Sequence, residues 1–132
     1  MKKIIFQGDS ITDASRSRDK DFNRGYGFAT MVTGILGSRF PGEYTFLNRG
    51  VGGNRIADIK ERNAREVIAE KPDYVSFLAG VNDVWYYLDN AANTGGCAYW
   101  LMDGIYPTSP AHYLIALKWA EAFETNFLKD RE

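Results

Sequence analysis

Four features of the sequence have the side chains and the spacing needed for nucleophilic acyl transfer. Ser10 follows a short apolar run, a corner at which a serine can present its hydroxyl to a cleft beside backbone N–H groups. The pair Gly52–Gly53 allows a second loop to bring its backbone close to a bound group. Asn82 offers an amide that can donate to a developing oxyanion, and Asp103 is a carboxylate of the kind that orients a histidine base. The same residues also fit a plainer interpretation as turn glycines, an Asx cap and a solvated acid.

Three short apolar runs, each followed by a loop that contains glycine, are the elements that must position these side chains. The runs cover residues 3–6, 44–47 and 74–79, and each has the length expected of a buried strand. Between them, apolar residues at three- and four-residue steps predict helices over residues 27–40 and 56–70. This alternation predicts an α/β fold with a parallel sheet, in which the loops carrying the candidate residues meet at the carboxyl ends of the strands. A flavodoxin-like nucleotide or phosphate binder shares the strand pattern, but the sequence has no phosphate-cradling glycine loop that opens a helix.

The chain after residue 83 follows a different pattern. Residues 84–90 predict a short aromatic-rich helix, and residues 91–97 have the small, polar composition of a linker. Ser109 is a good N-cap for a terminal helix, and Pro110 suits its first position. Seven apolar residues are expected to line one side of this helix: Tyr113, Leu114, Leu117, Ala120, Phe123, Phe127 and Leu128.

Composition excludes several classes of protein. The 132 residues suffice for one domain, and 16 basic against 17 acidic residues lack the basic excess of a nucleic-acid-binding protein. No apolar run is long enough to span a bilayer, and the one at Met1–Phe6 is too short for a secretory signal, so a cytoplasmic location is expected. Cys97 is the single cysteine, which rules out an internal disulfide framework and a cysteine-rich metal site, and His112 is the single histidine.

Four sequence blocks follow one another in an order and at a spacing that are typical of one family. Gly8–Asp13, Asn48–Asn54 and Gly80–Asp83 resemble the first three blocks of the SGNH (GDSL) hydrolases, a family of the esterase and lipase type, and Tyr99–Thr108 resembles the last. The resemblance covers nearly the whole chain. It implies one domain over residues 1–132 with the flavodoxin-like three-layer α/β/α sandwich of that family. It also implies hydrolysis of small carboxylic esters or thioesters through an acyl-enzyme, with no metal and no organic cofactor.

The resemblance implies a role for each candidate residue. Ser10 is expected to be the nucleophile, with its own N–H in the oxyanion hole. Gly53 is expected to supply a second backbone donor and Asn82 a side-chain donor, while Asp103 is expected to orient the catalytic histidine. Removing one oxyanion donor typically lowers turnover by about 10²–10³-fold, so these roles can be tested by substitution.

The catalytic histidine itself is replaced in the last block. Tyr106 stands there, three residues after Asp103, and a phenol with a reference pKa of about 10 is a poor acceptor for the serine proton at neutral pH. His112, six residues further on, is the less favoured base, because a histidine in the first turns of the terminal helix is more often a helix-terminus residue. We therefore expect a weakly active esterase. The alternative is a catalytically inactive binding or vestigial domain on the same scaffold.

The stretch between Asp83 and Trp100 is much shorter than in the family. A deletion junction is expected near residues 90–97, so the parallel sheet is expected to keep about three main strands. The run 74–79 then becomes an edge strand, and it has no lysine or proline to discourage pairing. We therefore expect self-association, either through this edge or by exchange of the terminal segment between chains.

Overall fold

The computed structural model describes residues 1–83 and 107–128 of the 132-residue chain. The described elements, in chain order, are β1 (Lys2–Gly8), α1 (Ser10–Asp13), α2 (Phe28–Arg39), β2 (Tyr44–Asn48), α3 (Ile56–Glu66), the 3₁₀ turn η1 (Ile68–Glu70), β3 (Tyr74–Leu78) and α5 (Ser109–Phe127). The strands form one parallel sheet in the order β2-β1-β3. The predicted α/β fold with a parallel sheet of three strands is therefore confirmed. The segments 84–90 and 90–97, for which a helix and a deletion junction were predicted, lie outside the described residues.

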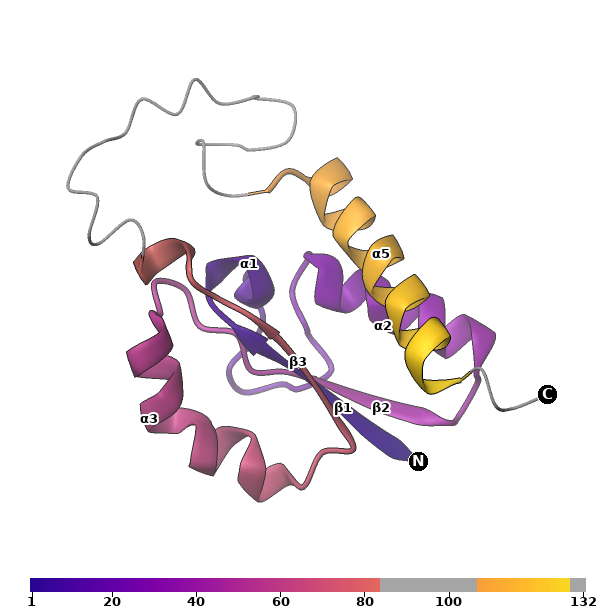
Figure 1. Cartoon of the computed structure of the whole chain (residues 1–132), viewed down its shortest axis with the longest axis horizontal. Helices are drawn as coiled ribbons and strands as arrows, with labels where there is room; N and C mark the ends of the chain where they lie inside the picture. Colours follow the sequence, from indigo (N-terminus) through magenta and orange to yellow (C-terminus); the bar gives the residue numbers. More distant parts are fainter. Residues whose placement is uncertain (84–106, 129–132) are drawn as a thin grey trace.

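The sheet is the middle layer of three. In the register, Ile5 of the central strand β1 pairs with Leu47 of β2 on one side and with Val75 of β3 on the other. Helices α2 and α5 lie together over one face of the sheet, and α3 lies over the opposite face (Figure 1). Because all three strands run in the same direction, the loops that follow them emerge at one edge of the sheet.

The main core lies between the sheet and the helix pair α2 and α5. Ile4 and Phe6 of β1 point into it, and the Phe6 ring packs edge-on against Phe28 with 5.8 Å between the ring centroids. Trp119 of α5 packs against this core and donates from Nε1 to Ser76 Oγ of β3 at 2.7 Å. This hydrogen bond joins the terminal helix to the third strand, although the two are far apart in the sequence.

The three strands and α2 have nearly the bounds that the sequence predicts for them. The helix predicted over residues 56–70 differs, because regular α-helix ends at Glu66 and η1 follows as a separate turn. Lys71, which ends that turn, has a left-handed backbone with φ of 49°. Pro72 comes next and has no backbone N–H with which to continue a helix.

The terminal helix corrects two details of the sequence prediction. Its N-cap is Thr108, so Ser109 is already the first helical residue. Its buried face carries His112, Ala116, Ala120 and Phe123, whereas three residues predicted for that face, Tyr113, Leu114 and Phe127, are 51%, 46% and 57% exposed. The buried face is set by the neighbouring helix. α5 packs along α2, and a face with small alanines allows the two helices to approach closely. None of the helices in residues 1–83 and 107–128 has the length and apolar character needed to cross a bilayer.

Replacing Gly8 tests the close approach of β1 to β3. A Cβ at Gly8 would lie 2.1 Å from the Leu78 carbonyl oxygen and 2.4 Å from Thr12 Oγ1. We expect Gly8→Ala to lower the free energy of unfolding in urea by about 1–3 kcal/mol, because backbone must move to admit the methyl group. Gly34→Ala in α2 is the matched control: no heavy atom lies within 4 Å of its added Cβ, and it should stabilise the helix by about 0.5–1 kcal/mol. Equal stability of the two variants would contradict this packing.

Candidate active site

Ser10 lies where the central strand turns into a single helical turn. Asp9, the N-cap of α1, is 1% exposed, and its Oδ1 accepts the Ile11 N–H at 3.0 Å. Ser10 is therefore the first residue of α1, directly beyond the carboxyl end of β1. The short helix ends at Ala14, whose backbone is left-handed with φ of 42°. The sequence prediction of a serine at a strand-to-loop corner agrees with this geometry.

The loop after β2 approaches Ser10 closely. Gly52 donates its N–H to Asp13 Oδ2 at 2.8 Å, and a Cβ at Gly52 would lie only 3.8 Å from the Cβ of Ser10. Gly53 has a φ of 78°, in the left-handed region that favours glycine, and no heavy atom lies within 4 Å of where its Cβ would be. The loop therefore turns at Gly53, one residue after its approach to Ser10, and the described residues leave the space at the Gly53 Cβ position open.

Asn48, the last residue of β2, anchors the base of this loop. It is 3% exposed, and its Nδ2 donates to the carbonyl oxygens of Thr12 at 2.6 Å and Arg24 at 2.9 Å. Its Oδ1 accepts the Gly50 N–H at 2.9 Å. The buried amide thus joins the loop after β2 to the segment that carries Ser10.

The loop after β3 is joined to the same loop. Asn82 donates from Nδ2 to the Asn54 carbonyl oxygen at 2.9 Å. Asp83 accepts the Ile56 N–H at 3.2 and 3.1 Å through its two carboxylate oxygens. These contacts bring the segments of Ser10, Gly53 and Asn82 to one edge of the sheet, as the sequence predicts for these three residues.

Of the other predicted site residues, only His112 is among those that the structure describes, and it lies in the core between α2 and α5 rather than beside Ser10. Asp103 and Tyr106 lie outside residues 1–83 and 107–128. His112 is fully buried in α5, where its Nδ1 accepts the Phe28 N–H at 3.0 Å and its ring stacks on Phe28 with 6.5 Å between the ring centroids. Burial lowers the pKa of His112 below its ordinary value, so burial favours the neutral imidazole at this packing position between α2 and α5.

Two residues that sequence reasoning left without a role help to hold the loops together. Asp13 accepts the Gly52 N–H and an Arg18 N–H on the same carboxylate oxygen, at 2.8 and 2.6 Å. Arg62 of α3, only 10% exposed in its side chain, donates to the end of β1 and to the loop after β2. The sequence signal for Asp13 is its place within the first block, whereas Arg62 looks like any charged residue on a surface helix.

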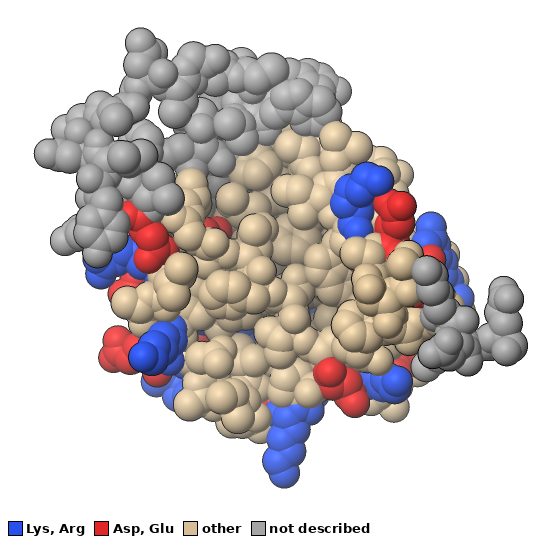
Figure 2. Space-filling view, viewed as in Figure 1, with Lys and Arg blue, Asp and Glu red and all other residues tan. Residues whose placement is uncertain are grey.

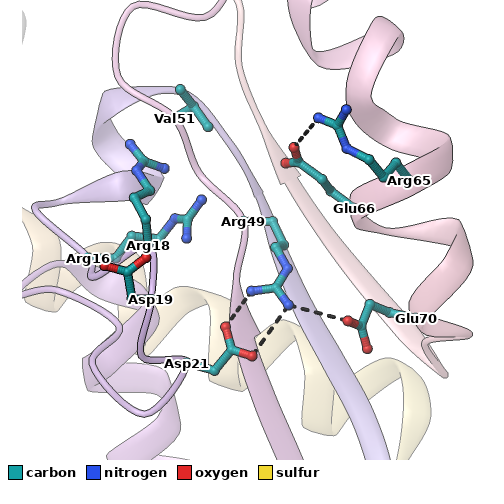
Figure 3. Close-up of a pocket in the computed structure, with 9 residues that line it drawn as sticks. All are labelled: Arg16, Arg18, Asp19, Asp21, Arg49, Val51, Arg65, Glu66 and Glu70. Carbon is teal, nitrogen blue, oxygen red and sulfur yellow. Dashed lines mark hydrogen bonds and ion pairs between the residues drawn. The ribbon is translucent and has the colours of Figure 1, made fainter.

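A hollow of about 570 Å³ lies between the segment after α1 and helix α3 (Figure 3). Its centre is Arg49, which pairs with Asp21 at 2.6 Å and with Glu70 at 3.3 Å. Its lining is Arg16, Arg18, Asp19, Asp21, Arg49, Val51, Arg65, Glu66 and Glu70. The lining does not include Ser10, Gly53 or Asn82, so this charged hollow is distinct from the candidate active site.

The arginines of this hollow support the loop backbone. Arg16 Nε and Arg18 Nη1 both donate to the Gly50 carbonyl oxygen, at 2.7 and 2.8 Å. Burial, with the nearby Arg18 adding to it, lowers the pKa of Arg16 to about 10. Like charges are thus brought together here to satisfy one buried loop carbonyl.

Comparison with known proteins identifies the family. Residues 6–113, from β1 into α5, match the GDSL-like lipase/acylhydrolase family. The chain belongs to this family. The four sequence blocks on which the resemblance was based all begin inside the matched range. The predicted membership of the SGNH (GDSL) hydrolases is therefore confirmed.

Relatives of this GDSL-family chain include esterases. Acetylxylan esterase of Geobacillus stearothermophilus is 40% identical over 93 residues, which are 67% of this chain and 42% of that protein. A solved variant of an acetyl xylan esterase from the same organism is 41% identical with a TM-score of 0.62, covering 67% of this chain and 43% of that one. An alpha/beta hydrolase enzyme from the metagenome of Lake Arreo, Spain, is 31% identical with a TM-score of 0.63, covering 92% and 54%. The GDSL-family chain therefore spans less than half the length of the curated relative.

Solved structures of the Geobacillus stearothermophilus enzyme also include three described as catalytic mutants. They replace a serine, an aspartate and a histidine that follows the aspartate by three positions.

In residues 1–83 and 107–128 of the GDSL-family chain, no group of three or more His, Cys, Asp and Glu side chains is placed to hold a metal ion.

The buried carboxylate of Asp9 generates a pH-dependent prediction. Burial raises the pKa of Asp9 above its usual value, with nearby Asp83 adding to the effect, and the buried Oδ2 has no hydrogen-bond partner among residues 1–83 and 107–128. A raised folded-state pKa means that stability is lost as the pH rises through it, because the folded carboxyl holds its proton more tightly than the unfolded one. Asparagine caps a helix as well as aspartate does and carries no charge.

We therefore measure the unfolding free energy of Asp9→Asn and of the parent chain at pH 4 and at pH 7. We expect the difference, variant minus parent, to be more positive at pH 7 than at pH 4. The control is Asp19→Asn, on the exposed part of the loop after α1. An effect of Asp9→Asn that is equal at the two pH values would show that desolvation of the Asp9 carboxylate is not a cost to the fold.

Proposed function

We propose that the chain is a serine esterase that hydrolyses small carboxylic esters or thioesters through an acyl-enzyme. The observation that carries the proposal is the approach of the Gly52–Gly53 turn to Ser10, with 3.8 Å between the Ser10 Cβ and a Cβ built at Gly52. Family membership and the esterase relatives support the same reaction class. Because an acetylxylan esterase is among these relatives, an acetyl ester is the first substrate to test.

In the proposed reaction, Ser10 Oγ attacks the ester carbonyl carbon as its proton passes to a base. The carbonyl π electrons move to oxygen, and the oxyanion is stabilised by the backbone N–H groups of Ser10 and Gly53 and by the Asn82 amide. An amide nitrogen carries two N–H bonds, so Asn82 can donate one to the Asn54 carbonyl and keep the other for the oxyanion. Collapse of the intermediate releases the alcohol, which takes up the proton. Water then attacks the acyl-enzyme in the same way and restores Ser10.

Asp103 and Tyr106 are proposed to occupy the acid and base positions of the triad. Their separation of three residues equals that of the aspartate and histidine replaced in the catalytic mutants of the Geobacillus stearothermophilus enzyme. A tyrosine in the base position accepts the serine proton poorly, so we propose weak turnover. The same substitution favours the alternative of an inactive binding or vestigial domain. A cytoplasmic location stays a prediction from the sequence.

Turnover of p-nitrophenyl acetate separates these functions. We expect slow Ser10-dependent turnover by the parent chain, loss of it in Ser10→Ala, and a rise in kcat/KM of about 10²-fold or more in Tyr106→His, because a positioned general base contributes about 10²–10⁴-fold. The double variant Ser10→Ala with Tyr106→His is the control for direct hydrolysis by the new imidazole. Turnover in Tyr106→His but not in the parent chain would favour the inactive alternative. Absence of Ser10-dependent turnover in every variant would contradict the esterase proposal.

We also propose that two copies of the chain associate through β3. In the described residues β3 pairs only with β1, and Val75 and Phe77 on it are 48% and 55% exposed. Figure 2 looks onto this edge, and the surface in the middle of the view belongs mainly to residues other than Lys, Arg, Asp and Glu. Because the strand carries no charge, a second β3 can pair antiparallel to it without repulsion.

Light scattering at micromolar concentration tests the association. We expect a mass above that of one chain, and we expect Phe77→Lys to shift the population toward monomer, because a charge on an edge strand opposes pairing. Tyr113→Lys is the matched control, since Tyr113 is also an aromatic residue about half exposed (51%) but lies on α5. A monodisperse monomer for the parent chain would contradict the proposal.

A further inference from the structure

Arg62, in the middle of α3, is a nearly buried cation whose donors reach four residues. Its side chain is 10% exposed. Nε donates to Asn54 Oδ1 at 2.7 Å, and Nη2 donates to the Gly8 carbonyl oxygen at 3.2 Å. Nη1 donates to the Arg49 carbonyl oxygen and to Glu66 Oε2, both at 2.7 Å. One planar group therefore satisfies two backbone carbonyls, one side-chain amide and one carboxylate.

The acceptors of Arg62 stand at the points that set the geometry of the candidate active site. Gly8 is the last residue of β1, two positions before Ser10. Arg49 and Asn54 are the two ends of the segment that carries Gly53. The Asn54 carbonyl in turn accepts the Asn82 amide at 2.9 Å. The guanidinium thus joins the end of β1 directly to the loop after β2, and through Asn54 to the loop after β3.

The fork geometry of arginine suits this position. The three nitrogens of a guanidinium lie in one plane and donate in fixed directions, so their acceptors are held at fixed separations. Glu66 compensates the charge at an i,i+4 spacing on the same helix. Burial alone raises the pKa of Glu66, but hydrogen bonds from Arg65 and Arg62 outweigh it and hold the pKa below its usual value. The Glu66 carboxylate therefore stays ionised at neutral pH, and the other donors of Arg62 are directed at the end of β1 and at the loop after β2.

We propose that Arg62 is a positioning residue, which holds the strand end before Ser10 and the 49–54 loop at the separation that lets Gly53 and Asn82 face the oxyanion formed at Ser10. The inference rests on the proposed esterase function for its catalytic consequence. Its structural part, the clamping of the loops, does not depend on turnover. A misplacement of about 1 Å caused away from the reacting atoms can cost about 10²-fold in rate, so such a clamp has a large effect without touching substrate.

Arg65 is a matched control one turn further along α3. It also pairs with Glu66, at 2.8 Å, but its side chain is 79% exposed and donates to that carboxylate on its own helix. Arg62→Gln removes the guanidinium fork, and Arg65→Gln removes the same kind of side chain from the surface. Arg62→Lys keeps the charge next to Glu66 but offers donors from a single nitrogen, which separates the effect of charge from that of the fork.

Amide hydrogen exchange tests the clamp in the parent chain without any assumption about activity. The N–H groups of Val51, Gly52 and Asn54 are hydrogen bonded within or beside the loop, and Ile5 in the central strand reports global stability. We expect Arg62→Gln and Arg62→Lys to speed exchange of the three loop amides by about tenfold or more relative to Ile5, and Arg65→Gln to leave the ratio unchanged. Equal acceleration at the loop and at Ile5 would mean a general loss of stability and would overturn the inference.

Kinetics in the Tyr106→His background test the catalytic consequence. We expect Arg62→Gln to lower kcat for p-nitrophenyl acetate by about 10²-fold with KM nearly unchanged, and Arg62→Lys to lose a similar factor. Arg65→Gln should stay within about twofold of its parent. A kcat per folded molecule that Arg62→Gln leaves intact, or that Arg62→Lys restores fully, would overturn the positioning role. If Tyr106→His itself shows no Ser10-dependent turnover, the esterase proposal fails, and the exchange ratio alone decides the clamp.

Discussion

The structure depends on parallel pairing of one central strand with both of its neighbours. Because β1 lies between β2 and β3, the segments after all three strands must emerge at the same edge. The approach is close enough that Gly8 leaves no room for a Cβ against the Leu78 carbonyl oxygen. Residues that directly follow β1, β2 and β3 are therefore brought close to one another by the strand pairing alone, without any contact from the helices.

Convergence of three loops creates a second requirement, which is the satisfaction of their backbone polar groups away from water. A buried carbonyl or N–H without a partner costs about 1–3 kcal/mol. Here the partners are side chains. Asn48, Asp13, Arg16 and Arg18 come from the end of β2 and from the segment after β1, and Arg62 comes from α3. The positions of Gly53 and Asn82 thus follow from hydrogen bonds that belong to the fold itself.

The fold could largely be predicted from sequence, because its strands are short apolar runs closed by glycine loops. The run 74–79 becomes β3 at Tyr74–Leu78, and the helix predicted over 27–40 becomes α2 at Phe28–Arg39. The buried face of α5 was predicted only in part: Ala120 and Phe123 are buried as expected, whereas burial of His112 and Ala116 depends on contact with α2, which no periodicity in α5 itself reveals. Arg62 was missed for a similar reason: its acceptors Gly8 and Arg49 lie 54 and 13 residues away in the chain. Ser10, Gly53 and Asn82 could be proposed because their residue types and their blocks are local signals.

The central claim is that Ser10, Gly53 and Asn82 face one tetrahedral oxyanion. A crystal structure of the chain after reaction with a p-nitrophenyl phosphonate tests this most directly, because the phosphonyl group on Ser10 mimics the tetrahedral intermediate. We expect an adduct whose phosphonyl oxygen lies about 2.7–3.1 Å from the backbone nitrogens of Ser10 and Gly53 and from Asn82 Nδ2. An adduct whose oxygen points away from Gly53 and Asn82, or modification at a residue other than Ser10, would contradict it.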